Sequence, residues 1–386
     1  MPGALDDVLV LDFSRVLAGP LATMLLADHG ATVVKVERPG SGDDTRQWGP
    51  PHDPAGTATY FLSVNRNKRS LALDLTDPDD LALARELAAR ADVVVENFRP
   101  GVMARLGLDY PTLAVANPGL VYCTITGFGS TGAGARMPGY DLLVQAVGGL
   151  MSITGPPEEP QKAGVALVDV ICGLFATTGI LAALRHRAAT GAGQRVEVDL
   201  LSSLLAALVN QASAYTGAGV VPRRLGNAHP SIAPYEVFAA GGGTRLVLAV
   251  GNDRQFQRLC EVLGAPELAR EARFATNPAR VRARDQLRAR LEALLASAPA
   301  ADWAQRLLDA GVPAGEVNDI AGAFVLAQRL GLEPIAELAP LAGDGPPTRV
   351  ARNPVRMSAS PPRHATAPPP LGELSRDEAR RLFGAA

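Results

Sequence analysis

The segment GVALVDVICGLFATTGILAAL (164–184) carries a single charged side chain, Asp169, among apolar, small and hydroxyl residues. Burying an unpaired charge is costly, so such a carboxylate raises its pKa or finds a partner. At helical spacing its neighbours are Val165, Ala166, Cys172 and Gly173, and none of them can pair with it. A carboxylate in such a position needs a reason beyond helix packing.

Cationic and polar side chains gather around the ends of predicted strands, at the edge where open α/β sheets bind ligands. They are Arg38, Arg46 and Trp48, three cations in NRNKRS (65–70), and Asn97, Phe98, Arg99 and Arg105. Because the chain is neutral overall, this concentration of arginines indicates a long anionic, phosphate-bearing ligand. Without the other arginines, Arg38 and NRNKRS could equally be solvated surface residues that bind no phosphate.

The segment GFGSTGAGARMPGYDLL (127–143) contains a G-x-G-x-x-G pattern after a predicted strand, as in dinucleotide-binding loops. Pro138 and further glycines oppose the helix that would hold a pyrophosphate, and no acid stands at the ribose-binding distance. We therefore interpret it as a glycine-rich crossover loop that can approach a ligand closely. Of the residues that follow, Asp141 is also a candidate helix cap and Tyr140 a half-buried aromatic.

The elements that must position these residues alternate between strand and helix. Apolar runs predict strands at 8–14, 31–38, 69–75, 92–98, 120–126 and 195–200, with helices at 17–30 and 77–91. Strands that are continuous apolar runs are typical of parallel sheets covered on both faces. The sequence therefore predicts an α/β fold with a doubly wound parallel sheet.

The character of the chain changes after this region. We expect a large Rossmann-like domain at 1–200, a linker helix at 201–225 and a small domain at 226–330, with 335–386 packing back on the large domain. The pattern predicts an apolar helix at 200–215, a strand at 244–251 and helices from 253 to 332. The proline-rich tail (346–370) cannot form a helix or a central strand, so we expect it to run extended over another domain or subunit.

Composition limits the classes of function. The chain has 386 residues and a formal net charge of −2, which gives no electrostatic footprint for nucleic acid or an anionic membrane. Three separated cysteines and five scattered histidines predict neither a disulfide framework nor a metal site. The N-terminus lacks a basic region before an apolar run, so we expect a cytoplasmic protein. Lysine occurs only at 35, 68 and 162, a bias attributed to codon usage.

Segment 164–184 is also long enough to span a bilayer. A central aspartate is costly in hydrocarbon, and glycine, threonine and alanine dilute the apolar character of the segment. A buried core helix is the better interpretation.

Taken together, the motifs resemble class III (CaiB/BaiF-type) CoA-transferases over essentially the whole chain. They are VLDFSRVLAGP, ADHGATVVKVERPGSGDDTR, NRNKRSLALDL, ENFRPG, GYDLLVQA, GVALVDV, RRLGNAHPSIAPYEVF, AVGND, AGVPAGEVND and APPPLGEL, in that order. The resemblance implies a formyl-CoA transferase-like fold with a Rossmann-like large domain, a smaller α+β domain and two subunits interlocked as rings. It also implies acyl-CoA and a small carboxylate as substrates, with no metal and no NAD.

The resemblance assigns roles to individual residues. Asp169 matches the family's nucleophile, and Tyr140 and Asp141 match the pair beside the reacting acyl group. GNAHP (226–230) matches a mobile loop of the family. The resemblance assigns catalytic roles to Gly226, Asn227 and His229 of this loop, and His229 is a candidate ligand for the substrate carboxylate. The implied CoA contacts are Val16, Arg38, Leu71, Ala72, Leu73, Asn97, Phe98, Arg105 and Arg136, and the implied substrate pocket is Leu17, Trp48 and Tyr60.

The implied activity moves CoA from an acyl-CoA, with succinyl-CoA among the candidate donors, to a small carboxylic acid. It passes through an Asp169 anhydride and an aspartyl-CoA thioester. GNAHP in place of a glycine run, and Leu17 in place of glutamine, argue against formyl or oxalate substrates. The alternatives are a 2-methylacyl-CoA racemase, a non-catalytic CoA-binding protein and an NAD-dependent oxidoreductase. Tyr140 stands where racemases carry histidine, and a phenol of ordinary pKa about 10 cannot readily act as that base.

Overall fold

The computed structural model describes residues 2–340 and 347–384, and the chain forms two compact units. The first unit comprises Met1–Leu150, Ala163–Val220 and Leu332–Ala386, and the second comprises Met151–Lys162 and Val221–Gly331. The sequence-based division placed 151–162 in the large domain. In the structure this segment joins the second unit, because the Arg224 guanidinium donates hydrogen bonds to the carbonyls of Pro156 (3.0 Å) and Pro157 (2.8 Å).

The first unit is built on the predicted parallel sheet, whose strand order is β3-β2-β1-β4-β5-β6. The strands are β1 Leu9–Asp12, β2 Thr32–Glu37, β3 Lys68–Ala72, β4 Val93–Glu96, β5 Val121–Thr126 and β6 Gln194–Asp199. Val10 of β1 pairs with Val33 on one side and with Val93 on the other. This order reverses direction between β1 and β4, so the ligand crevice of a doubly wound fold lies there. The fold class predicted from the sequence is confirmed.

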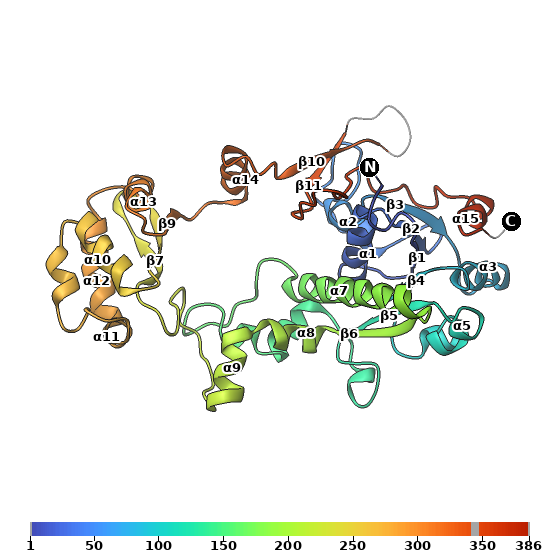
Figure 1. Cartoon of the computed structure of the whole chain (residues 1–386), viewed down its shortest axis with the longest axis horizontal. Helices are drawn as coiled ribbons and strands as arrows, with labels where there is room; N and C mark the ends of the chain where they lie inside the picture. Colours follow the sequence, from blue (N-terminus) through green and yellow to red (C-terminus); the bar gives the residue numbers. More distant parts are fainter. Residues whose placement is uncertain (1, 341–346, 385–386) are drawn as a thin grey trace. The chain divides into compact units, whose positions relative to one another are not determined.

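Helices cover both faces of this sheet (Figure 1). On one face, α1 (Ala18–Asp28) and α7 (Leu167–Thr190) pack their apolar residues against the valines of β1 and β4. On the other, α3 (Pro78–Ala88), α5 (Tyr110–Ala116) and the C-terminal α15 (Arg376–Leu382) share a core with Leu11 of β1, Val34 of β2 and Val94 of β4. Shorter helices lie in the connections: α2 (Thr59–Val64), α4 (Val102–Arg105) and α6 (Asp141–Val147).

Helix α7 is the element predicted from segment 164–184. It is long and apolar enough to cross a membrane by length and composition alone. It packs on α1, however, so tightly that a Cβ on Gly173 would stand 2.7 Å from the carbonyl oxygen of Ala18. Cys172, Ala176 and Ile180 on the same side are fully buried. This side of α7 belongs to the core of the first unit, as the sequence predicted.

Two predicted elements are wrong in detail. The single helix expected at 200–215 is two helices, α8 (Leu200–Ala207) and α9 (Val209–Ala218), because Val209 has a left-handed φ of 43° that a continuous helix cannot contain. The helical stretch expected from 253 to 332 is interrupted by a strand, β9 (Ala314–Glu316).

The second unit joins an antiparallel sheet to a helical layer. The sheet comprises β7 (Tyr235–Ala239), β8 (Arg245–Ala249) and β9. Its core is closed by helices α10 (Asp253–Val262), α12 (Arg284–Leu295) and α13 (Ala300–Asp309). The short α11 (Asn277–Arg282) precedes α12, and α14 (Ile320–Arg329) follows β9.

The proline-rich tail contacts the first unit. β10 (Ile335–Leu338) and β11 (Thr348–Ala351) form an isolated antiparallel pair, so the tail contributes no central strand. Further along, the Thr366 carbonyl accepts from the Asn67 N–H (3.1 Å), and Glu373 pairs with Arg69 (2.7 Å). Of the segment 335–386 that was expected to pack on the large domain, residues 341–346 and 385–386 lie outside the described residues.

Candidate active site

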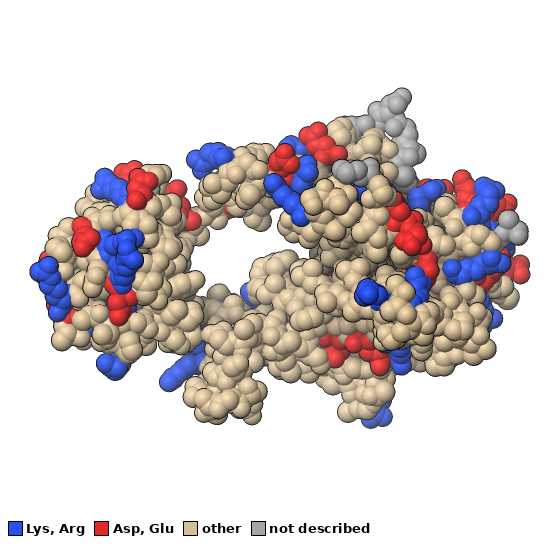
Figure 2. Space-filling view, viewed as in Figure 1, with Lys and Arg blue, Asp and Glu red and all other residues tan. Residues whose placement is uncertain are grey.

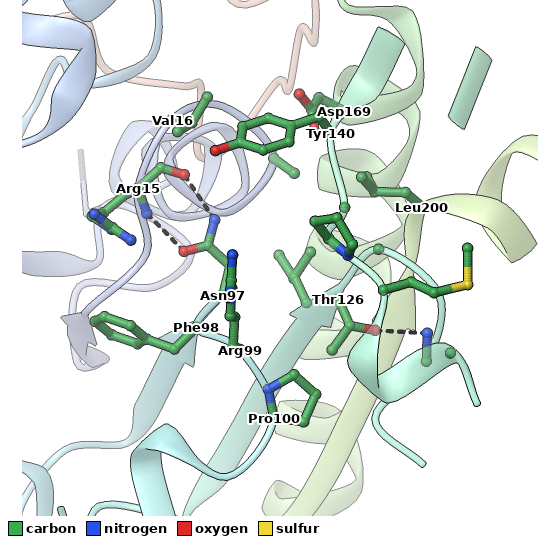
Figure 3. A pocket seen from close by; sticks show the side chains of 18 of the residues that line it. Arg15, Val16, Asn97, Phe98, Arg99, Pro100, Thr126, Tyr140, Asp169 and Leu200 are labelled. Atoms are coloured by element: carbon green, nitrogen blue, oxygen red, sulfur yellow. Dashed lines mark hydrogen bonds between the residues drawn. The ribbon is translucent and has the colours of Figure 1, made fainter. Parts of the chain in front are cut away.

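A cavity of about 190 Å³ lies at the carboxyl ends of β1, β4 and β5, and Asp169 stands on its wall. We call it the Asp169 cavity. Asp169 and Tyr140 project from one side, and Arg15 and Phe98 lie across from them (Figure 3). Six residues predicted from the sequence line this cavity: Val16, Leu17, Asn97, Phe98, Tyr140 and Asp169. The predicted crossover loop also contributes, through Gly127, Gly129, Gly134 and Gly139.

A second cavity of about 280 Å³ meets the first at Arg15 and Phe98, which line both. We call it the Arg38 cavity. Its wall is mostly apolar, with Leu73 among its apolar residues, and it also carries the exposed Arg38, the half-buried Arg15 and the exposed Asp74. Arg15 also pairs with Asp44 at 3.3 Å. The Arg15 guanidinium lies 5.5 Å from the centre of the Phe98 ring. The two cavities together offer an apolar recess, two cations and a path to Asp169.

The Asp169 carboxylate is poorly solvated, and this changes its pKa. Burial, with a smaller contribution from the charge of Asp141, raises the pKa of Asp169 to about 7. No cation lies within ion-pair distance of it in the described part of the chain. Near neutral pH a large fraction of this side chain is therefore an anion with little stabilisation, the state that a nucleophile needs.

Asp141 caps the helix that carries Asp169. Its Oδ1 accepts hydrogen bonds from the backbone N–H groups of Val168 (2.8 Å) and Asp169 (3.3 Å), and Oδ2 accepts from Gln145 (2.6 Å). The sequence suggested that Asp141 caps the helix that follows it, α6. In the structure Asp141 caps α7 instead. Asp141 thus fixes the start of α7 and adds a negative charge next to Asp169.

Replacing Asp141 by asparagine is expected to lower the pKa of Asp169, because one of its two raising causes is removed. The asparagine oxygen can still cap α7, so folding should be retained. The pH dependence of kcat/KM measures the result: its acidic limb should move to lower pH. Asp319→Asn, at the cap of α14, is the matched control and should leave the limb in place. An unchanged limb in the Asp141 variant would contradict the assignment.

A buried ionic network holds the loop that forms the floor of the Asp169 cavity. Lys35 and Asp43, both fully buried, pair at 2.8 Å. The Asp43 carboxylate also accepts from the backbone N–H of Val16, whose φ of 71° is unusual for a β-branched residue. Asn97 completes the support, donating to the Arg15 carbonyl (2.8 Å) and accepting from the Arg15 N–H (2.9 Å). The predicted CoA contact Asn97 therefore positions backbone as well as lining the cavity.

The remaining predicted residues lie outside these two cavities. Leu71 and Ala72 lie in β3, Arg105 in α4 and Arg136 in a short 3-10 turn beside the cavity wall. Trp48 and Tyr60 pack edge to face with ring centres 5.0 Å apart, and Tyr60 and Val16 both pack against the buried cluster that contains Leu17. Burial, with the nearby charges of Asp169 and Asp141, raises the pKa of Tyr60 to about 12, which places Tyr60 close to the predicted nucleophile.

The phosphate-binding interpretation of NRNKRS is wrong, and so is the solvated turn. Each of its cations has an internal partner: Arg66 pairs with Asp28 (2.6 Å), Lys68 with Asp12 (3.1 Å) and Arg69 with Glu373 (2.7 Å). Lys68 is fully buried, and burial lowers its pKa to about 8. These cations hold the fold together.

Gly226, Asn227 and His229 belong to the second unit. The His229 Nδ1 accepts from the backbone N–H of Ser231 (3.1 Å), which leaves Nε2 as the donor nitrogen. The His229 ring lies 5.3 Å from that of Tyr235. A catalytic role for this loop stays a prediction.

Sequence reasoning missed Arg15, Asp43 and Lys35. The signal for Arg15 was its position directly after a predicted strand, within VLDFSRVLAGP. The signal for Lys35 was a lysine inside an apolar strand of a chain that otherwise uses arginine. Among the described residues, no group of three or more histidine, cysteine or acidic side chains could hold a metal ion.

Comparison with known proteins defines the class. The model of CoA-transferase family III matches residues 5–375. A succinate–glutarate CoA-transferase of Agrobacterium fabrum is 45% identical over 96% of this chain and 93% of its own length. An acetyl-CoA:oxalate CoA-transferase of Acetobacter aceti is 44% identical over 84% of each chain. The crystal structure of a CaiB/BaiF family protein from Brucella suis superposes with a TM-score of 0.87 and 41% identity, covering both chains fully.

The doubly wound fold and the carboxylate-bearing cavity are therefore those of an acyl-CoA-using transferase. This chain belongs to CoA-transferase family III, and it is a class III CoA-transferase. The resemblance stated from the sequence is confirmed.

Proposed function

We propose that this enzyme transfers CoA from succinyl-CoA to a small dicarboxylate, with Asp169 as the nucleophile. The observation that carries the proposal is the position of Asp169, a weakly solvated carboxylate on the wall of a cavity that shares Arg15 and Phe98 with the Arg38 cavity. Relatives named for succinate–glutarate and acetyl-CoA:oxalate transfer support the choice of small dicarboxylates.

The two cavities suit the two ends of CoA. The apolar side chains of the Arg38 cavity would receive the adenine, with Arg38 and Arg15 beside its phosphates. The pantetheine arm would pass along Arg15 and Phe98, which line both cavities, and bring the thioester to Asp169. Glycines in the wall keep side chains away from the reacting carbonyl and leave backbone N–H groups near the developing oxyanion.

The reaction then proceeds by exchange at acyl carbons. A carboxylate oxygen of Asp169 attacks the acyl-CoA carbonyl, and the C–S bond breaks to give a mixed anhydride and CoA thiolate. The thiolate attacks the Asp169 carbonyl, which forms an aspartyl-CoA thioester and releases the donor acid. The acceptor carboxylate attacks that thioester, and the returning thiolate takes the acceptor acyl group from the second anhydride. Asp169 leaves each cycle as a carboxylate.

A matrix of donors and acceptors tests this function. Succinyl-CoA and acetyl-CoA are each incubated with succinate, glutarate, oxalate and acetate, and new acyl-CoA species are followed by mass spectrometry. We expect succinyl-CoA with glutarate to give the fastest exchange, and oxalate to be slow because of Leu17 and GNAHP. Absence of exchange for every pair, from folded protein that binds CoA, would contradict the proposal.

We also propose that the enzyme is an interlocked homodimer. Large apolar side chains stand exposed along consecutive helices of the first unit: Leu142, Leu143 and Val147 on α6, Leu174, Phe175 and Leu181 on α7, and Leu205 on α8. The surface over α8 and α9 carries few charged side chains (Figure 2). Exposed apolar surface of this extent marks an interaction site, and a second copy of the chain is the proposed occupant.

Leu174→Glu on this surface is expected to weaken the dimer, because it places a charge on apolar area that association would bury. Light scattering after size exclusion should give the mass of a dimer for the wild type and a monomer, or a concentration-dependent mixture, for the variant. Val115→Glu, at a position 85% exposed on α5, is the control and should remain dimeric. A monomeric wild type at micromolar concentration would contradict the proposal.

A further inference from the structure

The face of the sheet that α3 and α5 cover carries a cavity of about 200 Å³ that the proposed reaction does not use. We call it the Glu96 cavity. It lies at the carboxyl ends of β4 and β5, and the segment Arg99–Pro100 separates it from the Asp169 cavity by lining both. Tyr110 and Asp109, at the start of α5, form its outer wall.

Strand register aims three polar side chains into this cavity. Glu96 of β4 pairs with Thr124 of β5, and Tyr122 lies two residues before Thr124, so all three are on one face. They are nearly inaccessible, with exposed fractions of 5% for Glu96, 2% for Tyr122 and 6% for Thr124. Buried polar groups of this kind are normally satisfied by a partner.

None of these three groups has all the partners that its chemistry needs. The Tyr122 Oη and the Thr124 Oγ1 have no hydrogen-bond partner among the described residues. Glu96 accepts the backbone N–H of Phe98 (2.8 Å), but no ion pair holds its carboxyl in the described part of the chain. Burial raises the pKa of Glu96 to about 7 despite the hydrogen bond from the Phe98 N–H. This part of the cavity is therefore rich in acceptors, and the nearest cation is Arg195 of β6, the register partner of Tyr122.

Two arginines complete the lining of the cavity. Arg195 is partly neutralised by Glu197 at 2.8 Å, and Arg99 lies where the cavity adjoins the Asp169 cavity. Arg99 takes part in no ion pair in the part of the chain that the structure describes. With Glu96 and Asp109 as anions and Arg99 and Arg195 as cations, the lining offers partners of both signs, which matches a ligand that carries an ammonium group and a carboxylate.

We propose that the Glu96 cavity binds a small zwitterion, with its ammonium group between Glu96, Tyr122 and Thr124 and its carboxylate toward Arg99 and Arg195. An ammonium group has three donors, and the cavity offers the Glu96 carboxylate and two hydroxyl oxygens to receive them. Neither Asp169 nor the Arg38 cavity contributes to this site, which shares Arg99 and Pro100 with the Asp169 cavity.

Calorimetric titration of the full chain with β-alanine tests the proposal, with propionate and propylamine as controls that each lack one charged end. We expect saturable binding of β-alanine and at least about tenfold weaker binding of either control. Glu96→Gln should weaken β-alanine binding by about tenfold, because the acceptor charge is lost. Tyr122→Phe should weaken it less and, having removed an unpartnered hydroxyl, should fold at least as stably as the wild type.

Asp169→Ala separates this site from the active site, because β-alanine affinity should be unchanged in that variant while CoA transfer is lost. A crystal soaked in β-alanine should show density between Glu96 and Arg99. Three outcomes would overturn the proposal: no saturable binding, equal affinity in Glu96→Gln, or soaked crystals that hold only water in the cavity.

Discussion

Asp169→Asn is expected to lower CoA transfer by at least about 10⁴-fold, because the amide cannot form the anhydride. Binding of CoA should be retained, since Arg38, Arg15 and the apolar wall of the Arg38 cavity are untouched. Exchange measured by mass spectrometry, together with CoA titration, separates the two effects. Transfer at the wild-type rate would remove Asp169 from the mechanism.

The same variant is expected to be more stable than the wild type, by about 2 kcal/mol above pH 7. Folding raises the pKa of Asp169 from 3.8 to about 7, so the folded state holds a proton that the unfolded chain releases between these values. The wild type therefore loses stability as pH rises through that window, and asparagine does not. We expect about half of the stability difference that the full pKa shift would give, because the Asp169 side chain borders an open cavity and solvent reduces the effect. Denaturation midpoints should differ at pH 8 and converge near pH 4.

Asp12→Asn is expected to destabilise the first unit by about 3–5 kcal/mol, because it leaves Lys68 buried without its countercharge. The fully buried Asp12 accepts from Lys68 at 3.1 Å and from Thr23 at 2.6 Å. Burial opposes the ionisation of Asp12, but Lys68 and Lys35 still hold its pKa below the usual value. Denaturant unfolding monitored by circular dichroism gives the loss of stability.

Two further variants test whether the loss of the countercharge of Lys68 causes this destabilisation. Asp12→Asn combined with Lys68→Met removes both charges, and the double variant should be more stable than Asp12→Asn alone. Glu337→Gln breaks the exposed pair with Arg349, where both side chains are more than half exposed, and should change nothing measurable. Equal destabilisation by the single and double variants would contradict the countercharge explanation.

Asp169 could be predicted because a single acidic residue within a long apolar segment is unusual, and a single sequence is enough to see it. The sheet could be predicted because its strands are continuous apolar runs separated by helical patterns. Lys35 and Lys68 could not, because a buried lysine and a surface lysine look alike without knowledge of their partners. Their rarity was attributed to codon usage, yet both are fully buried in ion pairs. In an arginine-rich chain, a lysine within an apolar strand deserved a structural explanation.

The position of Asp141 shows a second limit of sequence reasoning. Its spacing favoured a cap on the helix that follows it, whereas the contact that matters joins it to Val168, twenty-seven positions along the chain. Pairings across such distances depend on how the sheet closes, which a local pattern does not encode. For the same reason, the joining of the two cavities at Arg15 and Phe98 appears only in the structure.

Isotope transfer from the acceptor to the enzyme tests the central claim most directly. Glutarate labelled with oxygen-18 is turned over with succinyl-CoA, and the peptide that contains position 169 is weighed after digestion. If Asp169 passes through an anhydride with the acceptor, heavy oxygen must enter its carboxyl group and no other acid of the chain. A peptide of unchanged mass after many turnovers would mean that no acyl group ever bonded to that oxygen.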